Sequence, residues 1–184
     1  MLKVTLKLGF WMMAVMLFLT TIASAQVINS GVQSIALSAT LAESISVNLS
    51  SNSVSFALTS GSASNAGSTG VTATTTWISK AGRNLTLYAY FSSSAAALSD
   101  GAGNNIPSAN FQISDNAAAF TGLTSTVAFG GASAGLSLYT VKITGLNKTG
   151  SHTDSMLFNI DLSTLPNLPA GTYAGTLNIQ AQVI

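Results

Sequence analysis

One short segment of the chain brings together residue types that catalyse hydrolysis. Ser151, His152, Thr153 and Asp154 are adjacent, and His152 is the chain's only histidine. A hydrolytic triad needs a histidine base within hydrogen-bonding distance of a hydroxyl, with a carboxylate behind the ring; this is a relation in space that adjacency in sequence does not provide. The segment follows Gly150 between two predicted strands, a setting typical of a turn. We therefore interpret it as a solvated hairpin turn and predict no catalytic residue.

A second set of side chains has the oxygen donors that calcium prefers. Asp100, Asn104, Asn105 and Asp115 offer carboxylate and amide oxygens, and calcium takes about six to eight oxygen ligands. Their spacing is not that of an EF-hand loop, since no glutamate closes the run. Aspartate, asparagine and glycine also form turns for reasons of local hydrogen bonding. We interpret the stretch as a turn and predict no metal site.

Aromatic side chains supply the candidate binding residues: Trp77, Tyr88 and Tyr90. In the strand predicted after Asn84, leucine, alanine and phenylalanine alternate with Thr86, Tyr88 and Tyr90, so the two tyrosines share the opposite face. An exposed pair of tyrosines is suited to stacking on a sugar ring. Aromatic residues are also ordinary strand residues that pack against a neighbouring strand or loop. Both interpretations stay open, and surface glycans are a candidate partner.

The composition excludes several classes of protein. The 184 residues include no cysteine, one histidine, 6 basic and 5 acidic side chains, with a formal charge of +1. Without cysteine there is no disulfide framework, thiolate zinc site or iron–sulfur cluster, and one histidine cannot form a multi-histidine centre. Nucleic-acid binding depends on clustered lysine and arginine, which this chain lacks. The scattered charges also argue against an enzyme, and we predict no cofactor.

The N-terminal residues have the pattern of a secretory signal peptide. Lys3 and Lys7 precede the apolar run Phe10–Leu19, and Ala23-Ser24-Ala25 forms a small-x-small cleavage site before Gln26. At its widest the apolar run is about fifteen residues, shorter than the roughly twenty of a spanning helix. We predict a signal peptide at residues 1–25, cleaved after Ala25, and a secreted or cell-surface protein. The mature chain, residues 26–184, is expected to have no membrane span.

Alternating apolar and polar residues define the predicted strands. The first three run from Ile35 to Leu41, from Ile45 to Leu49 and from Val54 to Leu58, each with one buried face. The small and polar residues from Gly61 to Gly70 predict a flexible loop. The clearest hairpin pairs residues 71–79 with 85–91 across a turn at residues 80–83.

Later segments continue the same pattern. Short strands are predicted around Phe111–Ile113 and Val127–Phe129, followed by longer ones at 136–144, 155–162 and 172–183. No segment has a helical apolar stripe. Nine or ten short strands without helical crossovers predict an all-β protein, a single immunoglobulin-like antiparallel β-sandwich over residues 26–184. A closed β-barrel is the alternative, because alternation alone does not distinguish one closed sheet from two stacked ones.

The C-terminal segment predicts a strand of the core. Pro169, Gly171 and Gly175 suit tight backbone geometry, and Leu177 to Val183 then places every second side chain on one face. The run Leu168–Ile184, with its PAGTYAGT turn, resembles the closing segment of secreted bacterial β-sandwich proteins of the spore-coat-protein-U and fimbrial-subunit type. Those families commonly carry a disulfide, and this chain has no cysteine. The resemblance implies a non-enzymatic subunit of a surface fibre or coat.

Three functions from different classes follow from these observations. The leading hypothesis is an exported structural protein of the cell surface, a fibre or coat subunit. The alternative is an extracellular carbohydrate-binding or surface-binding module of the adhesin kind, and a secreted hydrolase is the third. The uncharged segment Gln33–Leu41 can pair within its own sandwich or be donated to another copy, whereas Thr172–Val183 can instead complete the sheet. Copies of the chain itself are therefore a candidate partner.

Overall fold

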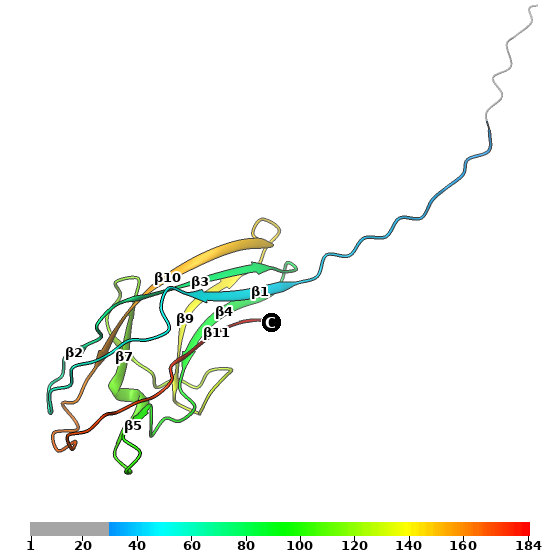
Figure 1. Cartoon of the computed structure of the whole chain (residues 1–184). Helices are drawn as coiled ribbons and strands as arrows, with labels where there is room; N and C mark the ends of the chain where they lie inside the picture. The colour runs from blue at the N-terminus through cyan, green and yellow to red at the C-terminus, as the bar shows by residue number, and fades with distance from the viewer. Residues whose placement is uncertain (1–29) are drawn as a thin grey trace, which may run out of the picture. The chain divides into compact units, whose positions relative to one another are not determined.

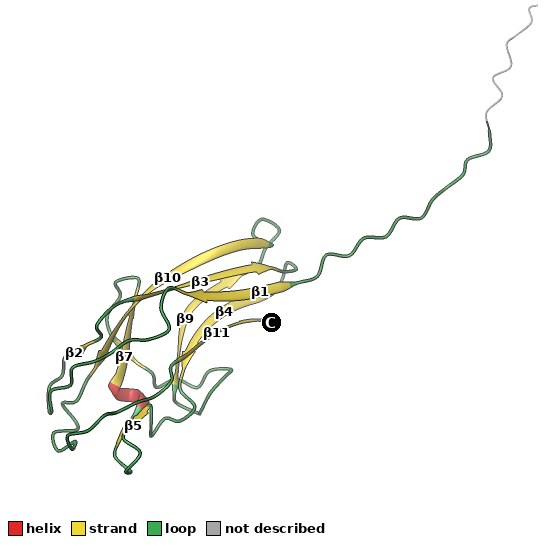
Figure 2. Cartoon of the chain, in the orientation of Figure 1, coloured by secondary structure: helices red, strands yellow, loops and turns green. Residues whose placement is uncertain are grey.

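The computed structural model describes residues 30–184, whose regular structure is almost entirely β-strand (Figures 1 and 2). The chain divides into two units at the boundary between Ala39 and Thr40. Residues 30–39, the described part of the first unit, form no helix or strand and are exposed. The predicted signal peptide and its cleavage site lie outside the described residues. No helix in residues 30–184 is long and apolar enough to cross a membrane.

The second unit contains a six-stranded antiparallel sheet. Its path runs β1, β3, β10, β7, β8, and β2 also pairs with β10. The strands are β1 (Ser44–Leu49), β2 (Asn65–Ala66), β3 (Val71–Ile78), β7 (Phe111–Asp115), β8 (Thr121–Gly122) and β10 (Thr149–Ile160). The long β10 joins the two halves of this sheet, because β3 pairs with its first part and β7 with its second.

The other layer is a three-stranded sheet in the order β11, β4, β9, also antiparallel. Its strands are β4 (Asn84–Tyr90), β9 (Gly135–Lys142) and β11 (Asn178–Val183). A two-stranded ribbon of β5 (Leu98–Ser99) and β6 (Asn105–Ile106) precedes a 3-10 turn, η1 (Ser108–Asn110). In the described residues the sheets do not close on themselves, so the predicted all-β sandwich is confirmed and the barrel alternative is wrong.

The core lies between the inner faces of the two sheets. Every second residue of β3 is buried, from Val71 to Trp77, and Leu85, Leu87 and Ala89 of β4 are fully buried. β-branched and aromatic residues suit this pleated, half-buried surface. The predicted inner face of residues 85–91 is therefore confirmed, whereas Thr86, Tyr88 and Tyr90 occupy the outer face and are partly exposed.

The predicted hairpin between residues 71–79 and 85–91 is wrong. β3 belongs to the six-stranded sheet and β4 to the three-stranded sheet, so the segment between them crosses from one layer to the other. Both strands bury a complete apolar face, and the two faces pack against each other when the strands lie in opposite layers. Gly82 at the crossing has φ +95°, a conformation that favours glycine.

Several strand predictions also change. Residues 35–41 form no strand, and neither do 54–58 or 127–129, although Phe56 makes an isolated bridge to Gly67. The segments predicted at 155–162 and 172–183 correspond to strands that begin at Thr149 and Asn178, respectively. Alternation identifies the apolar face of each segment, but burial and backbone pairing depend on which partner strands are in reach, and the apolar side chains of residues 35–41 stay exposed.

The Gly61–Gly70 region is not simply a flexible loop, because it contains β2. Asn65 in this strand is buried, its amide nitrogen donates to the carbonyl of Ile160 at 2.8 Å, and its Oδ1 accepts from the Thr59 amide at 2.7 Å. The backbone amide of Asn65 donates to Oδ1 of Asn159, also 2.8 Å. These hydrogen bonds satisfy buried polar groups and fasten the segment to β10.

Candidate functional site

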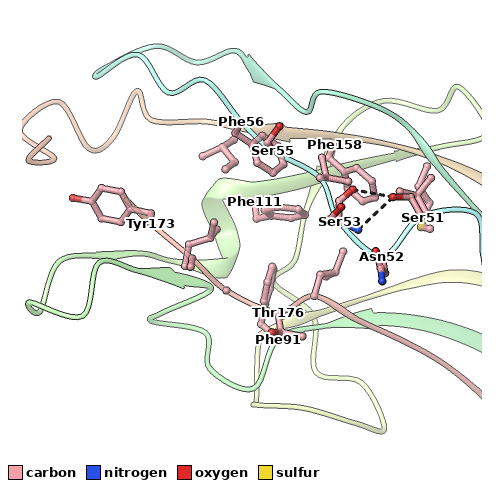
Figure 3. A pocket seen from close by; sticks show the side chains of 18 of the residues that line it. Ser51, Asn52, Ser53, Ser55, Phe56, Phe91, Phe111, Phe158, Tyr173 and Thr176 are labelled. Atoms are coloured by element: carbon pink, nitrogen blue, oxygen red, sulfur yellow. Dashed lines mark hydrogen bonds between the residues drawn. The ribbon is translucent and has the colours of Figure 1, made fainter. Parts of the chain in front are cut away.

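An apolar groove opens between the two layers on the side of β1 and β11. Its cavity volume is about 700 Å³, and its two sides are formed by residues 51–58, which follow β1, and residues 171–177, which precede β11. Figure 3 shows phenylalanine rings from both layers converging between these two segments. The groove therefore lies where each sheet ends in an edge strand.

The floor of the groove is a cluster of aromatic rings. Phe111 lies at its centre, 5.1 Å between ring centroids from Phe91 and 5.9 Å from Phe158, and both neighbours are buried. Phe56 approaches Phe111 edge-on at 5.8 Å and is only half-buried. Edge-to-face packing of this kind fixes the rings, so the groove has a preformed apolar floor.

The sides of the groove have free backbone groups. Among the described residues, Gly175, Thr176 and Leu177 make no hydrogen bond to another backbone group, and the ladder of β11 begins only at Asn178. Ala174 pairs with Ser99 on the opposite side of its segment. An edge with unpaired amide and carbonyl groups is a template for a further strand.

Gly175 shows how tightly this segment is held. A Cβ atom built at this position would lie 1.9 Å from the carbonyl oxygen of Ala97, so a larger residue would displace the backbone. The segment 171–177 is therefore pressed against the β5 region on one side, while its other side faces the groove. Its position is set by this packing together with the two backbone hydrogen bonds between Ala174 and Ser99.

Among the residues that the structure describes, no charged side chain lines the groove. Its lining residues are aliphatic, aromatic, small or hydroxyl-bearing, with one asparagine, Asn52. An occupant that carries a charge would lose hydration without gaining an ionic partner. The groove therefore suits an uncharged apolar ligand or polypeptide segment.

The described N-terminal residues have the matching character. Val32, Ile35, Leu37 and Leu41 are 91%, 85%, 91% and 79% exposed. No charged residue occurs from Gln26 to Ala42. Such a run of exposed large apolar side chains is unusual for a monomeric soluble protein and is typical of an interaction segment.

The three aromatic candidates do not form one surface. Trp77 is 5% exposed, and its indole nitrogen donates to the carbonyl of Asn147 at 2.9 Å, so its ring is not available for stacking. Tyr88 and Tyr90 are partly exposed on the outer face of β4, but Phe129 packs 5.9 Å from each ring. The packing interpretation describes these tyrosines better than an open platform does.

The turn interpretation of residues 151–154 is wrong. All four residues belong to β10, and His152 and Asp154 face the interior of the sandwich. The His152 Nε2 and Asp154 Oδ1 atoms are 3.0 Å apart, and the His152 ring stacks on Tyr139 at 3.6 Å between centroids. Ser151 and Thr153 alternate to the other face and are exposed, so neither of these two hydroxyls lies beside the His152 ring as a triad requires.

The candidate calcium ligands separate in the structure. The Asp100 carboxylate accepts hydrogen bonds from the backbone amides of Ala102 and Asn104 at 2.8 and 3.0 Å, which form an Asx turn. The hydrogen bond from the Asn104 side chain lowers the pKa of Asp100 most, and the backbone hydrogen bonds lower it further. Asp115 lies at the end of β7 instead. Among residues 30–184, no group of three or more histidine, cysteine or acidic residues is arranged to hold a metal ion.

Comparisons with protein-family models, curated proteins and solved structures found no match to this chain. The groove is the feature that sequence reasoning missed. Its signal was present in the alternation of residues 54–58 and of the strand predicted at 172–183. The fold leaves the first segment, and the part of the second before Asn178, outside the strand ladders.

Proposed function

We propose that this protein is an exported, non-enzymatic structural subunit of a cell-surface fibre or coat, whose copies join by strand pairing. The observation that carries the proposal is the combination of an open apolar groove with an exposed, uncharged apolar segment in the same chain. The predicted signal peptide and the resemblance of the C-terminal segment to fimbrial and spore-coat proteins support it.

The occupant proposed for the groove is the segment Gln33–Leu41 of a second copy. Its large side chains alternate with small or polar ones, so an extended conformation presents Ile35, Leu37 and Leu41 to one side. That spacing matches a strand laid over an apolar floor, with the polar residues turned to solvent. Neither the segment nor the groove carries a charge that would oppose this pairing.

Burial of the donated side chains supplies the driving force. Each large aliphatic side chain that moves from water into the groove contributes roughly 1.5–3 kcal/mol. Backbone hydrogen bonds along the free edge near Gly175–Leu177 add direction and register. Ordering the donated segment opposes these gains, so several apolar side chains must be buried together for a stable joint.

The test compares two variants, each with one negative charge at a different one of two neighbouring positions in the segment. Leu37→Asp places a carboxylate on the apolar face, and Ser38→Asp places the same charge on the polar face. We expect Leu37→Asp to weaken self-association at least tenfold, since about 1.4 kcal/mol corresponds to that factor. Ser38→Asp should retain association close to that of the unchanged protein.

Association is measured by light scattering and electron microscopy on protein recovered after expression of the full chain. Circular dichroism checks that both variants keep the fold, which is expected because both positions are exposed. Equal association of the two variants would contradict strand donation. A chain that stays monomeric at high concentration would contradict the subunit role itself.

The binding-module alternative rests on Tyr88 and Tyr90 alone. The Tyr90 hydroxyl donates to Oε1 of Gln180 at 2.6 Å, and Phe129 contacts both rings, so the pair is already engaged within the protein. The groove, by contrast, is an apolar cavity of about 700 Å³, and its side at Gly175–Leu177 has backbone groups without backbone partners among the described residues. We therefore favour the structural subunit.

A further inference from the structure

A polar cluster lies within the sandwich at the interface between β10, β7 and β9. Asp154 of β10 is fully buried, and its Oδ1 faces His152 Nε2 at 3.0 Å. The Asn116 amide nitrogen bridges the two acids, 3.3 Å from Asp154 Oδ1 and 3.2 Å from Asp115 Oδ2. Two carboxylates thus share one amide donor.

Each acid also has an oxygen without a partner. Asp154 Oδ2 and Asp115 Oδ1 are buried and accept no hydrogen bond from the described residues. Ionised carboxylates are acceptors only, so neither acid can supply a donor to the other. A proton bound at this pair provides the missing donor and removes the repulsion between two like charges.

Among the described residues of the cluster, His152 is the group able to gain a positive charge. His152 is the only histidine in the chain, and protonation turns its contact with Asp154 into an ion pair. The ring of Tyr139, from β9 in the opposite sheet, lies parallel to it at an interplanar angle of 9°. Proton uptake at this cluster therefore acts on contacts that hold the two layers together.

The titratable groups of the described residues that face the cluster come from β10, β7 and β9. β10 contributes His152 and Asp154, β7 contributes Asp115, and β9 contributes Tyr139; the buried Thr75 of β3, which pairs with His152, does not titrate. Burial and the Asp154 charge raise the pKa of Asp115, while His152 opposes this. Burial, then Asp154, raises the pKa of Tyr139, which stays neutral in this range.

We propose that His152, Asp154 and Asp115, bridged by Asn116, form a proton-responsive latch that stabilises the sandwich more in mildly acidic solution than at neutral pH. The sign follows from linkage. A group that binds its proton more tightly when folded stabilises the fold below its unfolded pKa and loses that contribution as the pH rises through its folded pKa.

Acids elsewhere in the chain respond in the opposite direction. The pKa values of Glu43, Asp100 and Asp161 are lowered by hydrogen bonds, so their contributions are lost only as the pH falls through those lowered values. The pKa of Asp115 is raised instead, so the latch adds stability as the pH falls, in the range above those lowered values. This inference does not depend on the proposed assembly.

The experiment is urea unfolding of the protein between pH 4.5 and 7.5, followed by tryptophan fluorescence. We expect the midpoint to rise as the pH falls from 7.5 to about 5. Asp115→Asn should raise the midpoint at pH 7.5 and flatten the profile, because the amide removes the repulsion at every pH. His152→Gln should also flatten it, since glutamine keeps a hydrogen-bonding group but no charge.

Asp161→Asn is the matched control, because Asp161 is bonded to Ser163 outside the cluster; it should keep the wild-type rise. The ring resonances of the single histidine provide a second readout: they should change position in Asp115→Asn and stay unchanged in Asp161→Asn, because only the first variant alters the charge near the ring. A midpoint that falls steadily below pH 7.5, or equal profiles in all variants, would overturn the proposal.

Discussion

β1 and β3 are neighbouring strands of one sheet with the same alternation, yet their inner faces differ in burial. Val71 and Ala73 of β3 are 5% and 0% exposed, whereas Ile45 and Leu49 of β1 are 37% and 44% exposed. They pair directly, Leu49 with Ala73 and Ile45 with Trp77. Alternation thus determines which way a side chain faces, and only the opposing layer determines whether it is covered.

The positions of β1 and β3 within their sheet explain this difference in burial. β3 lies inside its sheet and packs against β4 in the middle of the opposite sheet, whereas β1 is an edge strand whose continuation borders the groove. An edge strand with exposed inward apolar residues is an aggregation liability unless another strand covers it. In the proposed assembly, the segment Gln33–Leu41 of another copy is that cover.

The largest effect is expected from truncating leucines on the two kinds of surface. Leu87→Ala removes a fully buried side chain and should reduce the free energy of unfolding by about 2–5 kcal/mol. Leu49→Ala should cost about 1 kcal/mol or less in the isolated chain, because nearly half of its surface is already exposed. Chemical denaturation of both variants measures the difference.

Under the assembly proposal, Leu49→Ala has a second consequence, because Leu49 lines the groove. It should weaken self-association more than it weakens the fold. If Leu49→Ala and Leu87→Ala lower the free energy of unfolding equally, the inner face of β1 is as well covered as the centre of the core. That result would contradict the difference in burial between the edge strand and the core.

A smaller effect is expected at the residue before β1. Glu43 Oε1 accepts from the Lys80 amide at 2.7 Å, and Oε2 lies 3.1 Å from the Arg83 guanidinium. The hydrogen bond from Lys80 is the main cause of the lowered pKa of Glu43. Glu43→Gln should therefore destabilise the chain slightly at neutral pH, and the difference should disappear as the pH falls through the lowered pKa.

Thermal unfolding of this variant and the unchanged protein at pH 7 and pH 3 tests the assignment. A difference that persists unchanged at pH 3 would mean that the carboxylate charge is not what joins the start of β1 to the β3–β4 crossing.

Much of the architecture could be predicted from the sequence, because buried faces follow directly from alternation. The strand at residues 71–79 and the inner face of residues 85–91 are predicted correctly. Pairing the two as a hairpin is wrong, because a short connection serves a turn within one sheet or a crossing between layers equally well. The segment at His152 was misread because serine, threonine and glycine in β10 have turn-like composition.

The groove was harder to predict than the strands. It lies between segments 51–58 and 171–177, which have strand-like alternation but belong to no strand ladder. Local sequence does not indicate whether a partner strand will lie beside such a segment. The latch depends on the register of β10 with β7, which brings Asp115 opposite Met156 and near Asp154. Such register is a property of the whole sheet.

The most direct test of strand donation uses the absence of native cysteine. Leu37→Cys is combined with Thr176→Cys in the groove, and a short bifunctional thiol reagent is added; Ser38→Cys with Thr176→Cys is the control. Strand donation predicts a ladder of covalent oligomers on denaturing gels for the Leu37 pair and much less cross-linked product for the control. Exclusive cross-linking within single chains, or none for either pair, would contradict it.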